Sequence, residues 1–410
     1  MRATTVDIDL VVREVLARHH LGSGCGTQGV TGISRDLCGL HSTRSLSPYI
    51  SLWARSDGFE ADQLDAELYG SRSLARVNCM RNTVHCVPSD ELPVYHAATT
   101  SRFLPEFHRF VEMISKAGSG QPSPLSIPPY LAGFSFESTR GRILDLLESG
   151  GPMTSSEIAE RVPELGARIG YSGGKSYSGT FSLGSRVITG MCLLGDLIRT
   201  RPRGTWRSNL WEYAPLGTWL PSVELGSIDP MEATASLVRR YLATYGPATT
   251  DDICWWAGLS ASRLVRALDL LEGETERVKI GKGGPEGLAL LGSEAGSVAP
   301  PGACMLPSLD PLVMGYRDRS RFLSPRLDDK VFDRNGNSMP TVLEDGKITG
   351  IWMEEGGGMK VMVWSTVNRH SLMGRARELS SFLGLEGRVD ITSYPSDVYV
   401  RALFRLGRRV

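Results

Sequence analysis

The chain has 410 residues and 45 basic side chains against 45 acidic ones, so its formal net charge is zero. This length exceeds a single ordinary hydrophobic core and predicts three or four domains. Neutrality excludes a uniformly basic nucleic-acid binder, in which positive charge covers the whole surface.

The first predicted module covers residues 1–117. Apolar side chains recur with helical spacing in four stretches, namely residues 7–20, 33–40, the run through Tyr49, Leu52 and Trp53, and 61–69. Residues 74–77 and 83–87 alternate like strands and are expected to form a hairpin that turns at Arg81 and Asn82. Helices followed by a hairpin are the element order of a winged helix.

The same order repeats in residues 118–224, which open with a linker rich in Pro, Ser and Gly. The expected elements are helices from Thr139, from Pro152 and over 183–194, then a hairpin with strands at 197–200 and 210–213. Thr154 and Glu157 have the spacing of a capping box, in which each side chain bonds the backbone amide of the other residue.

A third copy occupies residues 225–295, with helices at 237–245, after Thr249 and at 260–271, then a hairpin near Val278 and 288–291. Three tandem winged helices are therefore the economical interpretation. After residue 296 short strands alternate with Asp-Gly and Gly-Gly turns, and one helix is expected at 372–382. Residues 296–410 are predicted to form a small β-rich, barrel-like domain, so the expected fold class is α+β.

Cysteine content and the N-terminus indicate the environment of the protein. The seven cysteines are odd in number and form no C-x-x-C pair, which argues against a disulfide framework and a zinc site. No apolar signal core opens the chain, and a run of about 18 apolar residues occurs nowhere. We therefore expect a cytoplasmic monomer that does not enter a membrane and needs no metal or other cofactor.

The polar loop after residue 40 is suited to present reactive groups, because it lies between an apolar helix end and an aromatic-aliphatic run closed by Arg55. His41 and Thr43 are two residues apart, so on an extended segment their side chains point the same way. An imidazole nitrogen and a hydroxyl can then hold one water. The alternative is that His41 caps a helix end or bonds a backbone carbonyl, the usual fate of a lone histidine there.

Arginine gathers at the tip of the second hairpin, where Arg201, Arg203 and Arg207 surround Trp206. Only seven basic residues of the chain are lysines and 38 are arginines, the cation whose planar fork binds phosphate, although a GC-rich genome also raises arginine. Such a tip tracks phosphates or a minor groove, or it is a solvated hairpin end. A second basic cluster at 401–409 is a DNA contact or a solubilising tail.

Two further polar clusters have both a functional and a structural interpretation. In the first hairpin, Arg81 binds a phosphate or braces the module, and for His85 we favour the brace. In the last domain, Asp310 lies between an apolar strand and a proline turn. It either faces a site or, as we favour, pairs with an arginine and docks this domain on the others.

These stretches together resemble the AlkZ/YcaQ-like family of winged-helix DNA glycosylases. The resemblance rests on segments in the family's order, namely Gly39–Thr43 with Ser51–Arg55, Met80–His85, Tyr245–Thr249 with Trp255–Leu259, and Leu306–Pro311. It implies three tandem winged helices and a β-rich C-terminal domain in a C-shaped cradle for duplex DNA. It also implies removal of alkylated bases, including bulky adducts and crosslinks from genotoxic natural products, against which one branch protects the producing bacterium.

The family's catalytic motif is glutamine, a small or aliphatic residue, then glutamine or aspartate, and it falls on His41, Ser42 and Thr43. The motif holds and polarises the water that attacks C1′ of the deoxyribose. An N7-alkylguanine is already cationic and leaves without protonation, so imidazole and hydroxyl are expected to keep hydrolysis with an altered substrate. No lysine occurs before Lys116, which argues against Schiff-base lyase chemistry in this loop.

The sequence therefore predicts a monofunctional DNA glycosylase that acts on bulky alkylated purines in duplex DNA, in self-resistance to or repair of a genotoxic natural product. His41 and Thr43 handle the water, and Ser42, His85 and Asp310 support the site. The predicted DNA contacts are Arg44, Arg55, Arg81, Arg201, Arg203, Trp206 and Arg207. Two alternatives stay open: a catalytically silent DNA- or lesion-binding protein or transcription regulator, and a winged-helix scaffold for protein contacts.

Overall fold

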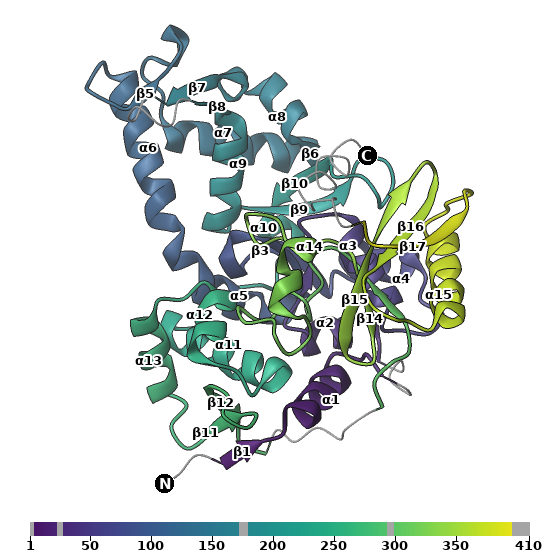
Figure 1. Ribbon diagram of the computed structural model, residues 1–410. Coiled ribbons are helices and arrows are strands. Elements are labelled where there is room, and N and C mark those ends of the chain that lie inside the picture. The colour runs from purple at the N-terminus through teal and green to yellow at the C-terminus, as the bar shows by residue number, and fades with distance from the viewer. Residues whose placement is uncertain (1–3, 23–27, 172–178, 293–298, 396–410) are drawn as a thin grey trace. The chain divides into compact units, whose positions relative to one another are not determined.

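The computed structural model describes residues 4–22, 28–171, 179–292 and 299–395 (Figure 1). The chain forms two compact units, which we call the terminal unit, residues Met1–Leu64 with Ala235–Val410, and the central unit, residues Asp65–Thr234. The predicted basic cluster at 401–409 lies outside the described residues. Helices and strands mix in both units, so the predicted α+β class is confirmed.

The terminal unit draws its elements from both ends of the sequence. Its helices are α1 (Ile8–Arg18), α2 (Val30–Asp36), α3 (Leu46–Trp53), α4 (Ala61–Asp65), α11 (Pro230–Tyr245), α12 (Thr250–Ala257), α13 (Ala261–Asp269), α14 (Asp328–Val331) and α15 (Arg369–Phe382). Its strands are β1 (Thr4–Val6), β2 (Leu40–His41), β11 (Thr275–Ile280), β12 (Glu286–Leu290), β13 (Cys304–Leu306), β14 (Thr341–Glu344), β15 (Lys347–Glu355), β16 (Gly358–Val363) and β17 (Val389–Ser393).

The strands after residue 303 form an open sheet in the order β13-β14-β15-β16-β17. Among the described strands β13 and β17 stay at opposite edges, so the predicted barrel-like domain is wrong. The helix α15 packs against β13, β16 and β17 and buries Leu372, Ala376 and Leu379. Because this helix covers a face of the sheet, the sheet buries that face without closing on itself.

A strand at the N-terminus was not predicted. β1 pairs in parallel with β11, with Thr4 opposite Val278 and Val6 opposite Ile280. Three residues are too few to show the alternation that marks a strand in a sequence. This pairing attaches the start of the chain to the hairpin of the third predicted module.

The central unit also mixes helices and short strands. Its helices are α5 (Leu92–Thr99), α6 (Leu104–Gly118), α7 (Phe136–Gly150), α8 (Ser155–Arg161), α9 (Leu183–Leu194) and α10 (Leu216–Trp219). Its strands are β3 (Leu74–Asn78), β4 (Val84–Pro88), β5 (Leu125–Ser126), β6 (Met153–Thr154), β7 (Arg168–Tyr171), β8 (Gly179–Ser182), β9 (Leu197–Pro202) and β10 (Trp211–Pro215). None of the described helices in either unit has the length and apolar composition needed to cross a membrane.

The hairpins predicted for the first two modules share one sheet of the central unit. β3 pairs with β4 and β9 pairs with β10, as predicted, and β3 also pairs with β9 where Arg76 lies opposite Arg199. Residues 65–117 therefore belong with 118–234, and the division expected at residue 117 does not coincide with the division between the two compact units. The pairing of β3 with β9 is long-range, and neither hairpin indicates it in its own sequence.

Local signals indicated α7, α8 and α9 of this unit, whereas α5, α6 and α10 were not predicted. α9 begins and ends at the predicted residues. At the start of α8 the Glu157 amide donates to the Thr154 hydroxyl at 3.3 Å, and the Thr154 amide donates to the Glu157 carboxylate at 2.8 Å. The predicted capping box is thus confirmed.

Replacing Thr154 with alanine removes the acceptor for the Glu157 amide. We expect the free energy of unfolding to fall by about 1 kcal/mol, the usual effect of losing an N-cap side chain. Ser138→Ala, at an exposed position inside α7, is the matched control and should change it by less than about 0.5 kcal/mol. Urea unfolding followed by circular dichroism measures both, and equal effects would contradict the capping account.

Candidate active site

The predicted loop is a short reversal between α2 and α3 of the terminal unit. Cys38 and Gly39 have positive φ angles of 55° and 98°. The Gly39 amide donates to the Ser34 carbonyl at 2.8 Å, and the Cys38 sulfur lies 3.3 Å from the Thr244 hydroxyl of α11. Because the φ angle at position 39 favours glycine, this residue turns the chain out of α2 and into β2, which carries His41.

His41 and Thr43 lie together at the end of this reversal. His41 and the intervening Ser42 are buried, at 4% and 1% exposure, while Thr43 is exposed. The Thr43 amide donates to His41 Nδ1 at 3.4 Å. Nδ1 is the acceptor in this contact. The imidazole is thereby oriented beside an exposed threonine.

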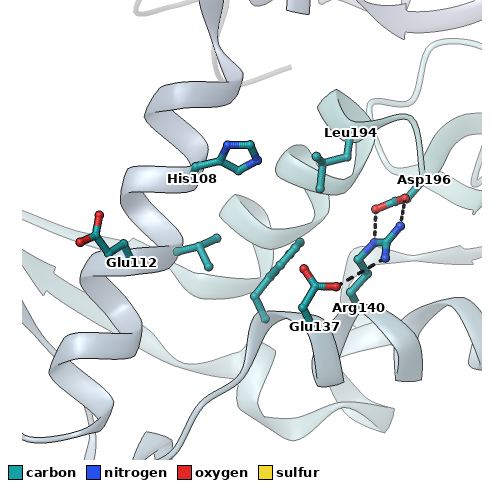
Figure 2. Close-up of a pocket in the computed structure, with 8 residues that line it drawn as sticks. His108, Glu112, Glu137, Arg140, Leu194 and Asp196 are labelled. Carbon is teal, nitrogen blue, oxygen red and sulfur yellow. Dashed lines mark hydrogen bonds and ion pairs between the residues drawn. The ribbon is translucent and has the colours of Figure 1, made fainter. Parts of the chain in front are cut away.

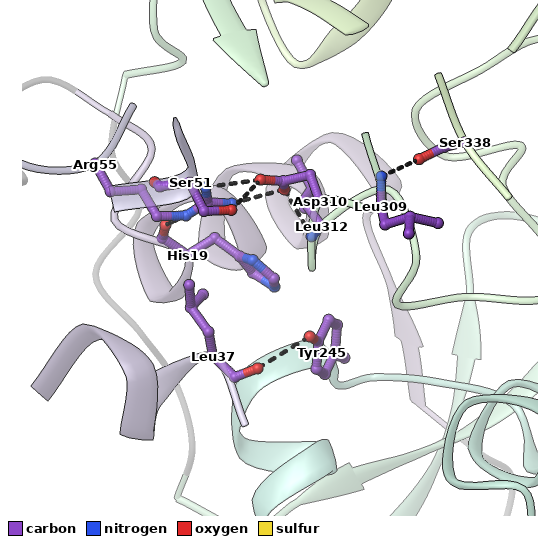
Figure 3. Close-up of polar contacts among 9 residues, drawn as sticks. All are labelled: His19, Leu37, Ser51, Arg55, Tyr245, Leu309, Asp310, Leu312 and Ser338. Atoms are coloured by element: carbon purple, nitrogen blue, oxygen red, sulfur yellow. Dashed lines mark hydrogen bonds and ion pairs between the residues drawn. The ribbon is translucent and has the colours of Figure 1, made fainter. Parts of the chain in front are cut away.

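The helix α3, which follows the loop, has one polar side in an otherwise apolar environment. Ser47, Ser51 and Arg55 are spaced by four residues and so lie on one side of the helix and its C-terminal turn. The Ser47 hydroxyl donates to the Ser308 carbonyl at 2.8 Å. The Ser51 hydroxyl donates to Asp310 Oδ2 at 2.9 Å (Figure 3). We call this set the α3 polar face; it fastens the helix to the segment after β13.

Arg55 completes the α3 polar face with a forked ion pair. Its Nη1 and Nη2 donate to the two carboxylate oxygens of Asp310 at 2.9 and 2.8 Å, and its Nε donates to the His19 carbonyl at 2.9 Å (Figure 3). Both side chains of the ion pair are 0% exposed. At this burial Arg55 offers no surface to a DNA phosphate, and its role in the structure is to hold Asp310.

An unusual backbone conformation directs Asp310 toward α3. Leu309 has a φ of 60°, a left-handed conformation that costs a non-glycine residue about 1 kcal/mol or more. Its amide donates to the buried Ser338 hydroxyl at 2.8 Å (Figure 3). The Leu312 amide donates to Asp310 Oδ1 at 3.0 Å. The carboxylate is therefore held by donors from its own segment as well as from α3.

His19, at the end of α1, is a buried histidine beside this ion pair. Its ring packs edge-on against Tyr245 with 4.9 Å between ring centres, and the Tyr245 hydroxyl donates to the Leu37 carbonyl at 3.2 Å (Figure 3). Neither ring nitrogen has a hydrogen-bond partner among the described residues. Burial, and then the positive charge of Arg55, lower the pKa of His19 well below its ordinary value. The imidazole is thus neutral in the folded protein.

Two predicted site residues lie in the first hairpin of the central unit. Arg81 has a φ of 54° in the turn between β3 and β4. His85 is buried in β4, and its Nδ1 lies 3.1 Å from the Thr83 carbonyl. Burial lowers the pKa of His85 to about 4, so this ring is also neutral near pH 7. A neutral, carbonyl-bonded ring fits the bracing role that we favoured for it.

The predicted DNA contacts at the second hairpin are surface residues. Arg201 is 60% exposed, and its guanidinium lies 4.7 Å from the ring centre of Tyr69. Arg203 is 51% exposed and bonds Glu157 at 2.9 Å and Glu212 at 2.7 Å. Trp206 and Arg207, like Arg44 in the terminal unit, are partly exposed. Of these arginines, Arg201 presents its charge most openly.

A cavity of about 380 Å³ opens in the central unit between α6, α7 and the end of α9 (Figure 2). Its polar lining residues are His108, Glu112, Glu137, Arg140 and Asp196. Arg140 donates to both oxygens of Asp196, at 2.7 and 2.5 Å, and forms one wall. No predicted site residue lines this cavity. In the described parts of the chain, no cluster of His, Cys, Asp and Glu side chains is arranged to hold a metal ion.

His19, Ser47 and Ser51 were not predicted from the sequence as part of the site. A buried histidine without hydrogen-bond partners has no sequence signature. The serines had one, because two serines and an arginine at four-residue spacing interrupt an apolar helix and so mark a polar contact on one face. Their partner segment lies about 255 residues later, and only the fold identifies it.

A family model described as "DNA glycosylase AlkZ-like" matches residues 34–379, a range that includes the loop, α3 and the segment after β13. Among solved structures, the DNA glycosylase AlkZ of Streptomyces sahachiroi is similar, with a TM-score of 0.68 and 16% sequence identity over 95% of this chain and 100% of that chain. At this identity the likeness shows the fold alone. No curated protein matches the chain.

Acid should destabilise the protein through His19. Its pKa is well below 6.5 in the folded state, so below about pH 6.5 the unfolded chain takes up a proton that the folded chain does not. The resulting loss is negligible at pH 7.5 and reaches about 1.4 kcal/mol at pH 5.5. Urea unfolding at both pH values should show that His19→Phe abolishes this part of the loss while His370→Phe, at an exposed position, does not. A wild-type pH dependence in His19→Phe would refute the assignment.

Proposed function

The chain belongs to the AlkZ-like family of DNA glycosylases, and we propose that it hydrolyses the N-glycosidic bond of bulky alkylated purines in duplex DNA. The observation that carries this proposal is that the family match spans the loop in which His41 and Thr43 lie together. We propose N7-alkylguanine adducts as the substrate class. We also propose that the protein is a monomeric cytoplasmic enzyme, whose role is self-resistance to a genotoxic natural product or repair of the damage that such a product causes.

The proposed reaction asks little of the protein beyond placing a water. An N7-alkylguanine is cationic, so the C1′–N9 bond breaks with its electron pair going to the departing base, which leaves neutral. Water then forms the new bond at C1′ and passes a proton to the His41 imidazole. His41 and Thr43 are proposed to hold this water, the imidazole through a ring nitrogen and the threonine through its hydroxyl. The absence of lysine before Lys116 supports hydrolysis rather than a Schiff-base route in this loop.

The arrangement of helices and hairpins supports three winged-helix modules as the DNA-binding framework. Each proposed module contains a hairpin, namely β3 with β4, β9 with β10 and β11 with β12. Helices α5 and α6 follow the first hairpin, and α10 follows the second. Arg201, stacked on Tyr69 and mostly exposed, is the arginine of the second hairpin best placed to meet a phosphate. Arg44, Arg81, Arg203, Trp206 and Arg207 remain proposed contacts.

A second candidate function is a silent lesion-binding protein or transcription regulator. It is favoured by one observation, the presence of histidine and threonine where the family's catalytic motif has glutamine and glutamine or aspartate. A regulator reads base edges and binds intact operator DNA. A glycosylase responds to the lesion whatever the surrounding sequence, so affinity for lesion-free duplexes of different sequence separates the two.

Single-turnover base release tests the catalytic proposal. Protein in excess is mixed with duplexes that carry one N7-methylguanine or one bulky N7 adduct, and the free base is quantified by chromatography. We expect wild type to release the bulky base and His41→Ala to be slower by about 10²-fold or more, because a positioned proton-handling group contributes that much. Thr43→Ala should be slowed as well.

The control for this experiment is His370→Ala, an exposed histidine of the terminal unit, which should release base at the wild-type rate. Tight binding without release by wild type would reject the enzyme and favour the silent binder. Release that is equal in wild type and His41→Ala would leave a glycosylase but remove His41 from its mechanism.

Salt dependence of binding tests the second hairpin. Each lost arginine–phosphate contact should lower the slope of log affinity against log salt by about 0.9 on duplex DNA. We therefore expect Arg201→Ala and Arg207→Ala each to reduce the slope of the intact-duplex titration, without altering sequence preference. Arg142→Ala, a half-exposed arginine of α7, is the control with an unchanged slope. Equal slopes in all variants would exclude this hairpin as a phosphate contact.

A further inference from the structure

The α3 polar face holds its helix at several points along the helix length. Ser47, Ser51 and Arg55 span roughly 12 Å at 1.5 Å per residue. Ser47 contacts Ser308, and Ser51 and Arg55 contact Asp310 (Figure 3). Contacts near both ends of a rod fix its tilt, its rotation and its position along the axis. The segment after β13 therefore sets all three for α3.

The loop leads into this helix through a short, buried connection. Ser45 is the N-cap residue of α3 and is buried at 1% exposure. Only three residues separate this cap from His41, and Thr43 is one of them. A tilt or rotation of α3 is consequently passed on to the two residues proposed to hold the water.

Stability alone does not account for the buried ion pair of Arg55 with Asp310. Removing two charges from water costs several kcal/mol per ion, and an apolar pair of similar volume often stabilises a protein as well or better. A forked pair adds direction, because two parallel N–H···O bonds fix the guanidinium plane relative to the carboxylate. The left-handed backbone at Leu309 is a second unfavourable feature, and it also contributes to the geometry of the forked pair.

We propose that Ser51, Arg55 and Asp310 are positioning residues for the loop, which set where His41 and Thr43 stand relative to C1′ of the bound nucleotide. This inference rests on the proposed glycosylase function. Misplacing a reacting group by about 1 Å lowers a rate by about 10²-fold. Loss of the α3 polar face therefore slows hydrolysis while affinity for the adducted duplex is retained.

The test is the double variant Arg55→Met/Asp310→Leu, which replaces the buried pair by apolar side chains. We expect the variant to fold and to keep the wild-type Kd for a duplex with one bulky N7 adduct. The single-turnover rate should fall by roughly 10- to 100-fold, and backbone amides 40–46 should exchange with deuterium faster. A wild-type rate in the folded double variant overturns the proposal.

Two further variants make the result specific. Arg140→Met/Asp196→Leu removes a forked pair of similar geometry in the central unit and should keep the wild-type rate; an equal fall there overturns the proposal. Ser47→Ala/Ser51→Ala removes two hydroxyls, keeps the ion pair, and should give a smaller fall. If Arg55→Met/Asp310→Leu does not fold, the double serine variant is the test, and a wild-type rate of base release in it overturns the proposal.

Failure of the glycosylase proposal is distinguishable from failure of this one. If wild type releases no base, the proposed reaction is rejected on that result alone. Deuterium exchange of amides 40–46 in the folded variants still reports whether the α3 polar face holds the loop. Unchanged exchange in Arg55→Met/Asp310→Leu overturns the positioning role, and faster exchange supports it.

Discussion

The buried ion pair between Arg55 and Asp310 is the interaction on which the terminal unit depends most. It joins residues 255 positions apart and is 0% exposed. Removing one partner alone strands a charge in the interior, at a cost of roughly 3–5 kcal/mol. The remaining guanidinium donors bond the carbonyls of His19 and Ser51. The end of α1, the C-terminal end of α3 and the segment after β13 thus meet at one guanidinium, and the proposed catalytic loop leads into the other end of α3.

The ion pair affects the protonation of the histidine buried beside it. His19 lies beside it as a neutral ring, since burial and the charge of Arg55 both lower its pKa. His41, in the loop before α3, accepts a hydrogen bond from the Thr43 amide, which orients the ring. A reaction whose leaving group is already cationic needs an oriented water more than a strong acid, and a firmly held loop suits that requirement. In this proposal the fold positions the water, and the alkylated base itself carries the positive charge that lets it leave.

Local patterns predicted much of the fold. The helix at 183–194, the hairpins and the capping box at Thr154 follow from periodicity, turn residues and caps that act within a few residues. Pairings between distant segments were missed, such as β1 with β11. For the same reason Arg55 was predicted to contact DNA, since its sequence neighbours do not indicate the carboxylate that buries it. The family resemblance indicated the loop with His41, which stays a prediction as the site, whereas the α3 polar face could be identified only from the fold.

We propose that the sugar of a damaged nucleotide reacts at the loop of His41 and Thr43. A crystal structure of the protein with a duplex that contains a cationic azasugar in place of the reacting deoxyribose would test this placement. We expect one water within about 3 Å of both His41 and Thr43, on the face of the azasugar opposite the departing base. An azasugar bound against other residues, with the loop facing only protein, would contradict the claim.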